Sequence, residues 1–328
     1  MTPRDRRAVA LWLLLCAAIV AAIVVVGGVT RLTRSGLSVV EWQPIVGALP
    51  PLSDADWQSL FDQYRATPEF RQVNFDITLD GFKRIFWWEY AHRLLGRVAG
   101  LAFLVPFLYF LLRKKFDFPL ALKLAGVFLL GALQGALGWY MVKSGLVDNP
   151  RVSQFRLTAH LGLALLIFSA QVWIAFDLLF ERSIFLKRKT TILILVFLMA
   201  LTGAMVAGIR AGSAYNSFPL MNGHLVPPEI LMLEPWWRNF GYNMATVQFV
   251  HRGFFWLLAG VIPYACWKAG FNSSSRILIA MFAFQAALGI ATLLSRVPIG
   301  LAAAHQAGAV LLLLSALWFA HASGRRAS

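Results

Sequence analysis

The sequence has few charged residues and almost no cysteine. Charged residues make up 14% of the 328 positions, and only 15 residues are acidic. Hydrophobic residues reach 59% and the mean hydropathy is +0.67, values that a soluble domain of this size would not tolerate. The two cysteines, Cys16 and Cys266, lie inside apolar runs. That placement suits small buried side chains and argues against a disulfide framework or a thiolate metal cluster.

Long apolar runs indicate a polytopic membrane protein. Each is close to the length of about 20 residues that a helix needs to cross a bilayer. No comparable stretch alternates polar and apolar residues, so a β-barrel is not expected. The first run is too long for a signal peptide and lacks a convincing cleavage site, so we expect it to be retained. The expected spans are residues 8–30, 86–112, 119–142, 157–176, 190–209, 244–267, 277–295 and 297–323.

The loop charges predict the orientation of these spans. An even number of spans places both termini on one side, where many Lys and Arg residues are opposed only by Asp5, Asp117, Asp177 and Glu181. We therefore expect cytoplasmic termini, with the basic loops facing anionic lipid. The basic residues are dispersed rather than gathered into one stripe, so the net charge of +15 does not indicate nucleic acid binding.

Three landmarks recur in the same order and divide the chain into two similar halves of four spans each. We therefore predict an all-α fold of two parallel four-helix bundles related by a pseudo-two-fold axis. The predicted bundles are residues 1–183 and 184–328, with the boundary in the basic loop at 181–189. The matched landmarks are Gly27, Arg34 and Gly36 with Gly203, Arg210 and Gly212; His92-Arg93 with His251-Arg252; and residues 134–138 with 285–289.

Four histidines lie at similar depths near the outer ends of the even-numbered spans: His92, His160, His251 and His305. An imidazole in lipid is costly without a partner. One such histidine alone is equally well explained by a hydrogen bond between helices. Two pairs on parallel spans favour two haems, each held between two neutral imidazoles. His224 and His321 lack the pattern, and we expect them to be ordinary surface or interfacial residues.

Charged residues accompany the histidines at the outer interface. Arg93, Arg97 and Arg252 can snorkel to the interface, neutralise haem propionates or do both, and Arg31, Arg34 and Arg210 can join them from the loops. Glu89 shares a helical face with His92, whereas its counterpart before His251 is Gln248, which does not titrate. This asymmetry favours chemistry in the first half and electron storage or structural support in the second. A helix-capping or interfacial glutamate is the alternative.

These ordered motifs resemble the heme A synthase family. The similarity covers nearly the whole chain and is closest to the proteobacterial and mitochondrial branch. The Gram-positive branch carries a cysteine pair in the first outer loop, which is missing here. The matching motifs are Glu-x-x-His-Arg at 89–93, Thr-Ala-His-Leu-Gly at 158–162, His-Arg at 251–252, Ala-His-Gln at 304–306, and the string from Gly27 to Ser38 that runs into Glu41 and Trp42.

The resemblance implies oxidation of the C8 methyl group of haem O to the formyl group of haem A, by successive hydroxylations and loss of water. It implies that His92 and His160 flank the substrate haem beside Arg93 and Arg97, with Glu89 as the catalytic carboxylate. His251 and His305 would ligate a haem b cofactor beside Arg252. Implied partners are haem O synthase and cytochrome oxidase assembly factors, and the sequence is compatible with a homo-oligomer.

Two other classes stay open from the sequence. A diheme b-type electron-transfer subunit that oxidises quinol would use the same four histidines. It has no need for the asymmetry between Glu89 and Gln248, and such subunits tend to place their haems on opposite sides of the membrane. A transporter or haem exporter predicts broken helices. Here only Pro106 and Pro263 interrupt the spans.

Overall fold

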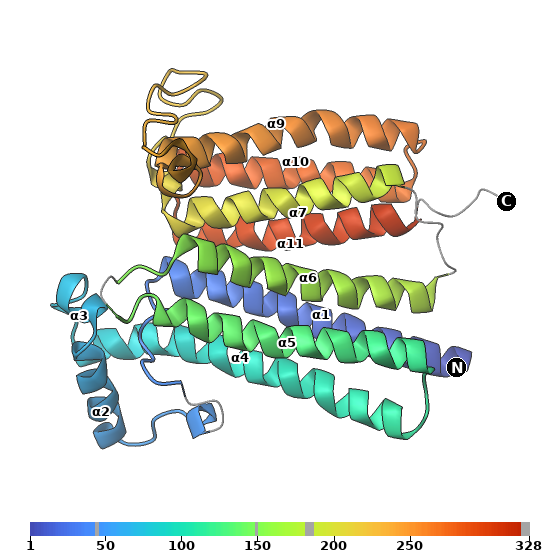
Figure 1. The fold of residues 1–328 in the computed structure, drawn as a ribbon, viewed down its shortest axis with the longest axis horizontal. Helices are drawn as coiled ribbons and strands as arrows, with labels where there is room; N and C mark the ends of the chain where they lie inside the picture. The colour runs from blue at the N-terminus through green and yellow to red at the C-terminus, as the bar shows by residue number, and fades with distance from the viewer. Residues whose placement is uncertain (43–45, 148–149, 181–186, 323–328) are drawn as a thin grey trace.

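The computed structural model describes residues 1–42, 46–147, 150–180 and 187–322 (Figure 1). Eight of the helices in these ranges are long and apolar enough to cross a membrane, which confirms the expected all-α polytopic fold. No β-strand occurs in the described ranges, which hold only an isolated bridge between Met221 and His224. The eight helices are α1 (Pro3–Leu32), α4 (Leu79–Leu112), α5 (Phe118–Lys143), α6 (Gln154–Leu179), α7 (Lys187–Gly208), α9 (Met244–Lys268), α10 (Ser273–Leu294) and α11 (Ile299–Ala322).

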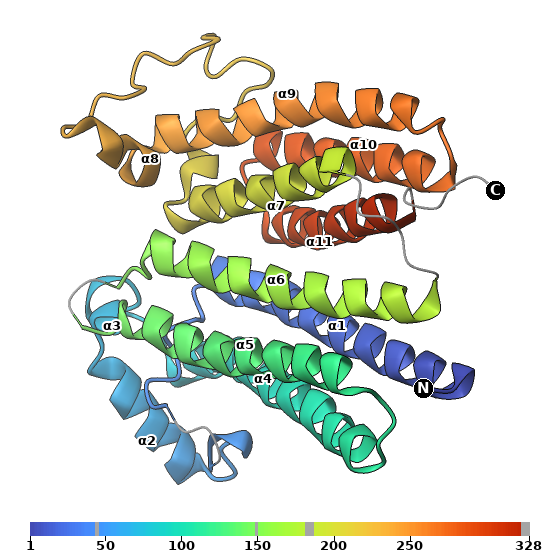
Figure 2. The ribbon, with the colours of Figure 1, turned by 45° about the vertical axis from the view of Figure 1, so that its right-hand side comes forward.

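The eight helices form two groups that follow the order of the chain. Figures 1 and 2 show α1, α4, α5 and α6 together in one group and α7, α9, α10 and α11 in the other. Across the seam between the groups, α6 contacts α7 and α11, and α1 contacts α11. The predicted boundary at residues 183 and 184 lies outside the described residues, between α6 and α7. The pseudo-two-fold relation between the groups stays a prediction.

The largest buried cluster lies at this seam and joins the two halves. Its side chains come from α1 and α6 in the first half and from α7, α9, α10 and α11 in the second. Because the burial of apolar surface is the main favourable term in folding, the two halves share a common core. The cluster includes Ala17, Val24, Leu165, Phe168, Val172, Ile192, Val196, Leu258, Ile262, Leu313, Ala316 and Phe319.

The matched helices α1 and α7 end in similar turns. Arg34 and Arg210, matched in sequence, both adopt the left-handed conformation, with φ angles of 54° and 56°. This conformation is uncommon for residues other than glycine. After Arg34, the backbone N–H of Ser35 donates to the carbonyl of Thr30 at 2.8 Å. The sequence match therefore extends to the backbone conformation at these two positions, where each chain segment leaves its helix.

The first outer loop contains two helices that we did not expect within residues 31–85. Helix α2 (Asp54–Arg65) begins with a capping box between Ser53 and Asp56, and α3 (Pro68–Gln72) follows it. Apolar residues at positions 57, 60, 61 and 64 have the spacing of an amphipathic helix and pack against the start of α4. Helix α4 begins at Leu79, whereas we expected its membrane span to begin at residue 86. His92 consequently lies further from the start of its helix than each of the other three histidines lies from the start of its own.

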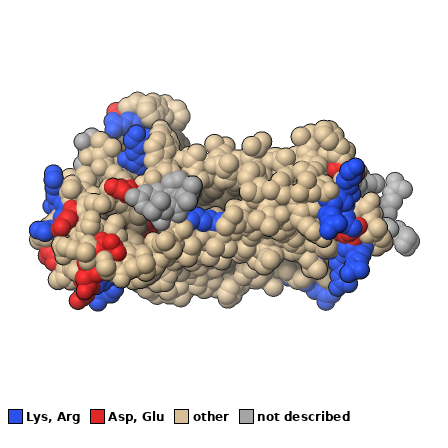
Figure 3. Space-filling model, turned by 90° about the horizontal axis from the view of Figure 1, so that it is seen from below, with Lys and Arg blue, Asp and Glu red and all other residues tan. Residues whose placement is uncertain are grey.

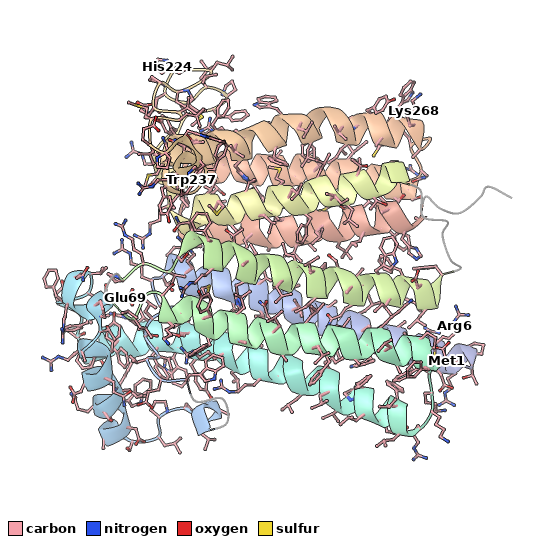
Figure 4. The ribbon with its side chains drawn as sticks, viewed as in Figure 1. Met1, Arg6, Glu69, His224, Trp237 and Lys268 are labelled. Atoms are coloured by element: carbon pink, nitrogen blue, oxygen red, sulfur yellow. The ribbon has the colours of Figure 1, made fainter. Side chains whose placement is uncertain are left out.

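Charge separates the two ends of the molecule. Figure 3 shows a broad band without charged residues, an end with mainly Lys and Arg, and an opposite end with both signs. Arg6 and Lys268 lie at the mainly basic end, whereas Glu69, His224 and Trp237 lie at the other (Figure 4). This distribution is the pattern expected of a multi-pass membrane protein. The end that carries α2, α3 and the loop before α9 is called the outer end below.

Cysteine labelling tests the predicted orientation. Cys16 and Cys266 are free and buried, as expected, so a maleimide should not label the parent protein. We expect Asp62→Cys, on exposed α2, to react in intact cells with a maleimide that does not cross membranes. Lys268→Cys, at the opposite end, should react only after the membrane is opened. The reverse pattern would show that the termini are not cytoplasmic.

Candidate functional site

Each of the four histidine rings packs directly against a glycine of a neighbouring helix. His92 lies against Gly27 of α1 and His160 against Gly138 of α5, while His251 lies against Gly203 of α7 and His305 against Gly289 of α10. A Cβ atom would lie 2.7 Å from Cε1 of the ring at Gly27, 2.9 Å at Gly138, 3.3 Å at Gly203 and 2.8 Å at Gly289. Three of these distances are shorter than side chains tolerate, so the glycines fix where each imidazole lies.

Glutamine side chains hold the second histidine of each half. Gln134 on α5 donates from Nε2 to the carbonyl of His160 at 3.0 Å, and Gln285 on α10 donates to the carbonyl of His305 at 2.9 Å. The same two helices supply Gly138 and Gly289. The repeated Gln-x-x-x-Gly landmark therefore has one structural meaning in both halves: it positions a histidine on the adjacent helix.

The structure brings the histidines together in the expected pairs. His92 lies near His160 in the first half, and His305 lies near His251 in the second. The Nδ1 atoms of His92, His160 and His305 are buried without a hydrogen-bond partner, whereas Nδ1 of His251 lies 2.8 Å from the hydroxyl of Thr202. A buried ring nitrogen without a partner is costly, and the cost is relieved only when that same nitrogen gains a hydrogen bond or coordinates a metal.

The donor set suits a metal that brings most of its own ligands. Within the described residues, no group of three or more His, Cys, Asp or Glu side chains could hold a bare metal ion. A haem iron already has four porphyrin nitrogens and needs only one or two axial ligands, for which imidazole is well suited. Two imidazoles in each half therefore fit a haem better than an isolated ion.

Glu89 is buried in the first half and surrounded by donors. Its Oε2 accepts from the hydroxyl of Ser38 and from the backbone N–H of Val39, both at 2.8 Å, and its side chain is 3% exposed. Its Oε1 forms an ion pair with Arg93 at 2.6 Å. These contacts hold the carboxylate in one orientation, one helical turn before His92. The capping interpretation does not fit, because α4 begins ten residues earlier at Leu79 (89 − 79).

The guanidinium of Arg93 is largely engaged by the protein itself. Besides the ion pair with Glu89, it donates to the carbonyl of Val39 at 2.6 Å and to that of Glu41 at 2.9 Å. Arg93 therefore ties the first outer loop to α4 and to Glu89, a role that the sequence did not reveal. Arg97 lies one turn further along α4, half-buried and within the influence of the charge on Arg93. That either arginine binds a propionate stays a prediction.

The second half has the same framework without the carboxylate. Arg252 donates to the carbonyls of Tyr215, Pro219 and Leu220, and Gln248 also donates to Tyr215 at 3.1 Å. The atoms that correspond to the Glu89–Arg93 ion pair, Gln248 Oε1 and Arg252 Nε, are both buried without a partner. In both halves an arginine next to the histidine anchors the outer loop, but only the first half places a carboxyl group beside that arginine.

One side chain links the two histidine layers across the seam. Gln306, the residue after His305, donates to the carbonyl of Val24 on α1 at 2.6 Å. It occupies the space beside Gly28, where a Cβ atom would lie 1.9 Å from its Oε1. The adjacent Gly27 takes the ring of His92, so neighbouring glycines on α1 receive side chains from both halves. The glycine pair at 27 and 28 was the sequence signal for this contact.

The remaining two histidines differ from each other. His224 is exposed in the second outer loop, as expected. His321 was expected to be an ordinary interfacial residue, but it is 1% exposed and its Nε2 lies 3.2 Å from Oδ1 of Asp177 on α6. Its ring contacts Trp173 and Phe176, so it belongs to the packing between α6 and α11.

Comparison with known proteins places this architecture in a family. A family model described as cytochrome oxidase assembly protein, COX15-CtaA, matches residues 10–317. A heme A synthase from Nitrosospira multiformis is 58% identical over 332 aligned positions, which cover 96% of this chain and 93% of the relative. The chain belongs to the heme A synthase family. A heme A synthase from Nitrosomonas eutropha is 54% identical, and the alignment covers 94% of this chain and 92% of the relative. A heme A synthase from Parvibaculum lavamentivorans is 48% identical, and the alignment covers 98% of this chain and 95% of the relative.

Alanine substitutions at two of these glycines test whether the contacts position the histidines of this protein. We expect Gly289→Ala to push the ring of His305 from its place and weaken haem retention in the second half, at a cost of about 1–3 kcal/mol. Gly203→Ala should have a smaller effect, because its Cβ would lie 3.3 Å from His251 rather than 2.8 Å as at Gly289. The measurement is the b-type absorption per mole of purified protein.

Gly260→Ala on α9 is the matched control, because a Cβ atom there would meet no atom within 4 Å. Equal haem content in Gly289→Ala and Gly260→Ala would refute the proposed role of the contact.

Proposed function

We propose that the protein oxidises the C8 methyl group of haem O to a formyl group, which gives haem A for terminal cytochrome oxidase. Similarity to heme A synthases along nearly the whole chain supports this proposal. The observation that carries it is the buried ion pair of Glu89 with Arg93, one turn before His92, together with its replacement by Gln248 in the second half. An oxidation that moves protons needs a titratable group, and only the first half supplies it at this position.

In this proposal, haem O is the substrate of the first half. His92 and His160 flank its iron, and Gly27 and Gly138 fix the positions of the two rings. The carboxylate of Glu89 accepts or returns a proton at its oxygens, which Ser38, Val39 and Arg93 already orient. Preorganised donors of this kind need no rearrangement when charge develops nearby. Arg97, and Arg93 through its remaining donor capacity, are the candidates for contact with propionates.

The cofactor of the second half is proposed to be haem b, held by His251 and His305 with Arg252 nearby. When bound, haem b supplies one-electron redox chemistry. The protein contributes two positioned imidazoles and a buried amide, Gln248, in place of a carboxylate. The second half therefore stores electrons and does not exchange protons at this position.

The proposed location is the bacterial inner membrane, with both haems toward the periplasmic side and both termini cytoplasmic. Proposed partners are haem O synthase, which makes the substrate, and cytochrome oxidase assembly factors, which receive the product. Anionic lipid faces the mainly basic end of the molecule. Assembly into a homo-oligomer is compatible with this function and is not required by it.

The alternative functions have less support. The relatives named above are heme A synthases, and nothing in the comparisons supports a diheme electron-transfer subunit. A transporter predicts broken spans, but α4 and α9 continue through Pro106 and Pro263, and the other described spans contain no interior proline beyond their first turn.

Replacement of the proposed catalytic carboxylate tests the function. We expect Glu89→Gln to lower haem A formation by about 10²-fold or more, because general acid–base groups contribute factors of this size. Haem content should stay near that of the parent protein, since the histidines are unchanged. The measurement is chromatography and mass analysis of haems extracted from cells that supply haem O. Glu234→Gln, the same change at an exposed position, is the control. Normal product yield from Glu89→Gln would remove Glu89 from the mechanism.

Replacement of the proposed cofactor ligands tests the division between the halves. We expect His251→Ala and His305→Ala each to abolish the stable b-type spectrum, because one imidazole cannot replace two in fixing the iron. His224→Ala, at an exposed position, should retain the full spectrum. The measurement is the reduced-minus-oxidised absorption of the purified protein. Survival of haem b in both ligand variants would mean that the cofactor lies elsewhere.

A further inference from the structure

Glu69 is a buried acid that the proposed chemistry does not use. It lies on α3 in the outer layer and is 5% exposed. Its Oε2 is buried and has no hydrogen-bond partner, although a carboxyl oxygen in such a position normally has one. Figure 4 shows Glu69 at the side of α3 that faces the helix ends of the first half. A buried carboxyl group with an open oxygen is available to take up a proton.

The charges around Glu69 come from four different segments. Glu89 of α4 acts on it with a like charge, and Arg34 and Arg210, which follow α1 and α7, act with opposite charges. Tyr64 of α2 is within reach of the charges of both Glu69 and Glu89. Glu69 is therefore near buried Glu89 and also near Arg34 and Arg210, which are exposed.

These surroundings bring the carboxyl group close to its titration point at neutral pH. Burial, followed by the charge of Glu89, raises the pKa of Glu69 to about 8, while Arg34 and Arg210 act in the opposite direction. A group whose pKa is near the working pH both gains and loses a proton readily. An exposed glutamate is already ionised at this pH and does not have this property.

We propose that Glu69 carries protons between Glu89 and the aqueous phase at the outer end of the molecule. A proton that leaves the site by way of Glu89 binds to Oε2 of Glu69 and then passes to solvent, and a proton that enters follows the reverse route. Arg34 and Arg210 stabilise the ionised form from which the next transfer starts. The inference rests on the proposed function, because it assigns the proton route that Glu89 needs.

The test is Glu69→Gln, which keeps the shape of the side chain and removes its titration. We expect haem A formation in membranes supplied with haem O to fall by about tenfold or more. We expect the pH profile of the parent protein between about pH 6 and about pH 9 to have an inflection near the pKa of Glu69, and Glu69→Gln to lack it. Glu69→Asp should restore part of the rate. Haem content and absorption should be unchanged, because Glu69 lies on α3, whereas the four histidines lie on other helices.

Infrared titration of the purified haem-loaded protein gives a readout that does not depend on turnover. The parent protein should show a protonated carboxyl band that disappears as pH rises through about 8, and Glu69→Gln should lack it. Asp62→Asn is the matched control, because Asp62 is an exposed acid of the same outer layer. It should keep both the band and the pH profile.

Two results separate this inference from the proposed function. If Glu89→Gln is inactive while Glu69→Gln has the rate and pH profile of the parent protein, the proton route is refuted and the function stands. If the parent protein forms no haem A, the function and the route fail together. Absence of any carboxyl band titrating near pH 8 overturns the route by itself.

Discussion

The contact between an imidazole ring and a bare helix backbone is the constraint on which the rest of the structure depends. Each histidine lies on a second or fourth span of its half, and the glycine that receives it lies on the span immediately before. The Cε1 edge of the ring can approach that helix so closely only where no Cβ intervenes. Since the contact recurs four times, it fixes both the spacing of adjacent helices and the depth at which the histidines lie.

The two halves use this common frame with different electrostatics. In the first half, Glu89 and Arg93 neutralise each other and also hold the outer loop through Ser38 and Val39. In the second half, Gln248 and Arg252 hold the outer loop through its carbonyls, and no negative charge is present at the matching position. The frame is therefore shared, whereas the buried carboxyl group belongs to one half. A second buried acid, Glu69, lies above that same half.

The sequence predicted most of the membrane part correctly, because apolar runs and repeated landmarks report on helices directly. The eight spans and the buried cysteines were both accessible in this way. The outer layer was predicted poorly. The spacing of Trp57, Leu60, Phe61 and Tyr64 indicates a helix, but it is short and lies in a polar region. Contacts between distant segments, such as Arg93 with Val39 or Gln306 with Val24, depend on tertiary packing and leave little local signal.

The two helices that carry His92 and His160, α4 and α6, are buried to different extents. Helix α6 contributes to the core shared by both halves, whereas α4 packs outside that core and is much less buried within the membrane region. Elements with fewer buried contacts yield at lower free energy than those in a core. If His92 and His160 hold the substrate iron as proposed, His92 would be the easier ligand to displace, because α4 packs outside the shared core that holds α6.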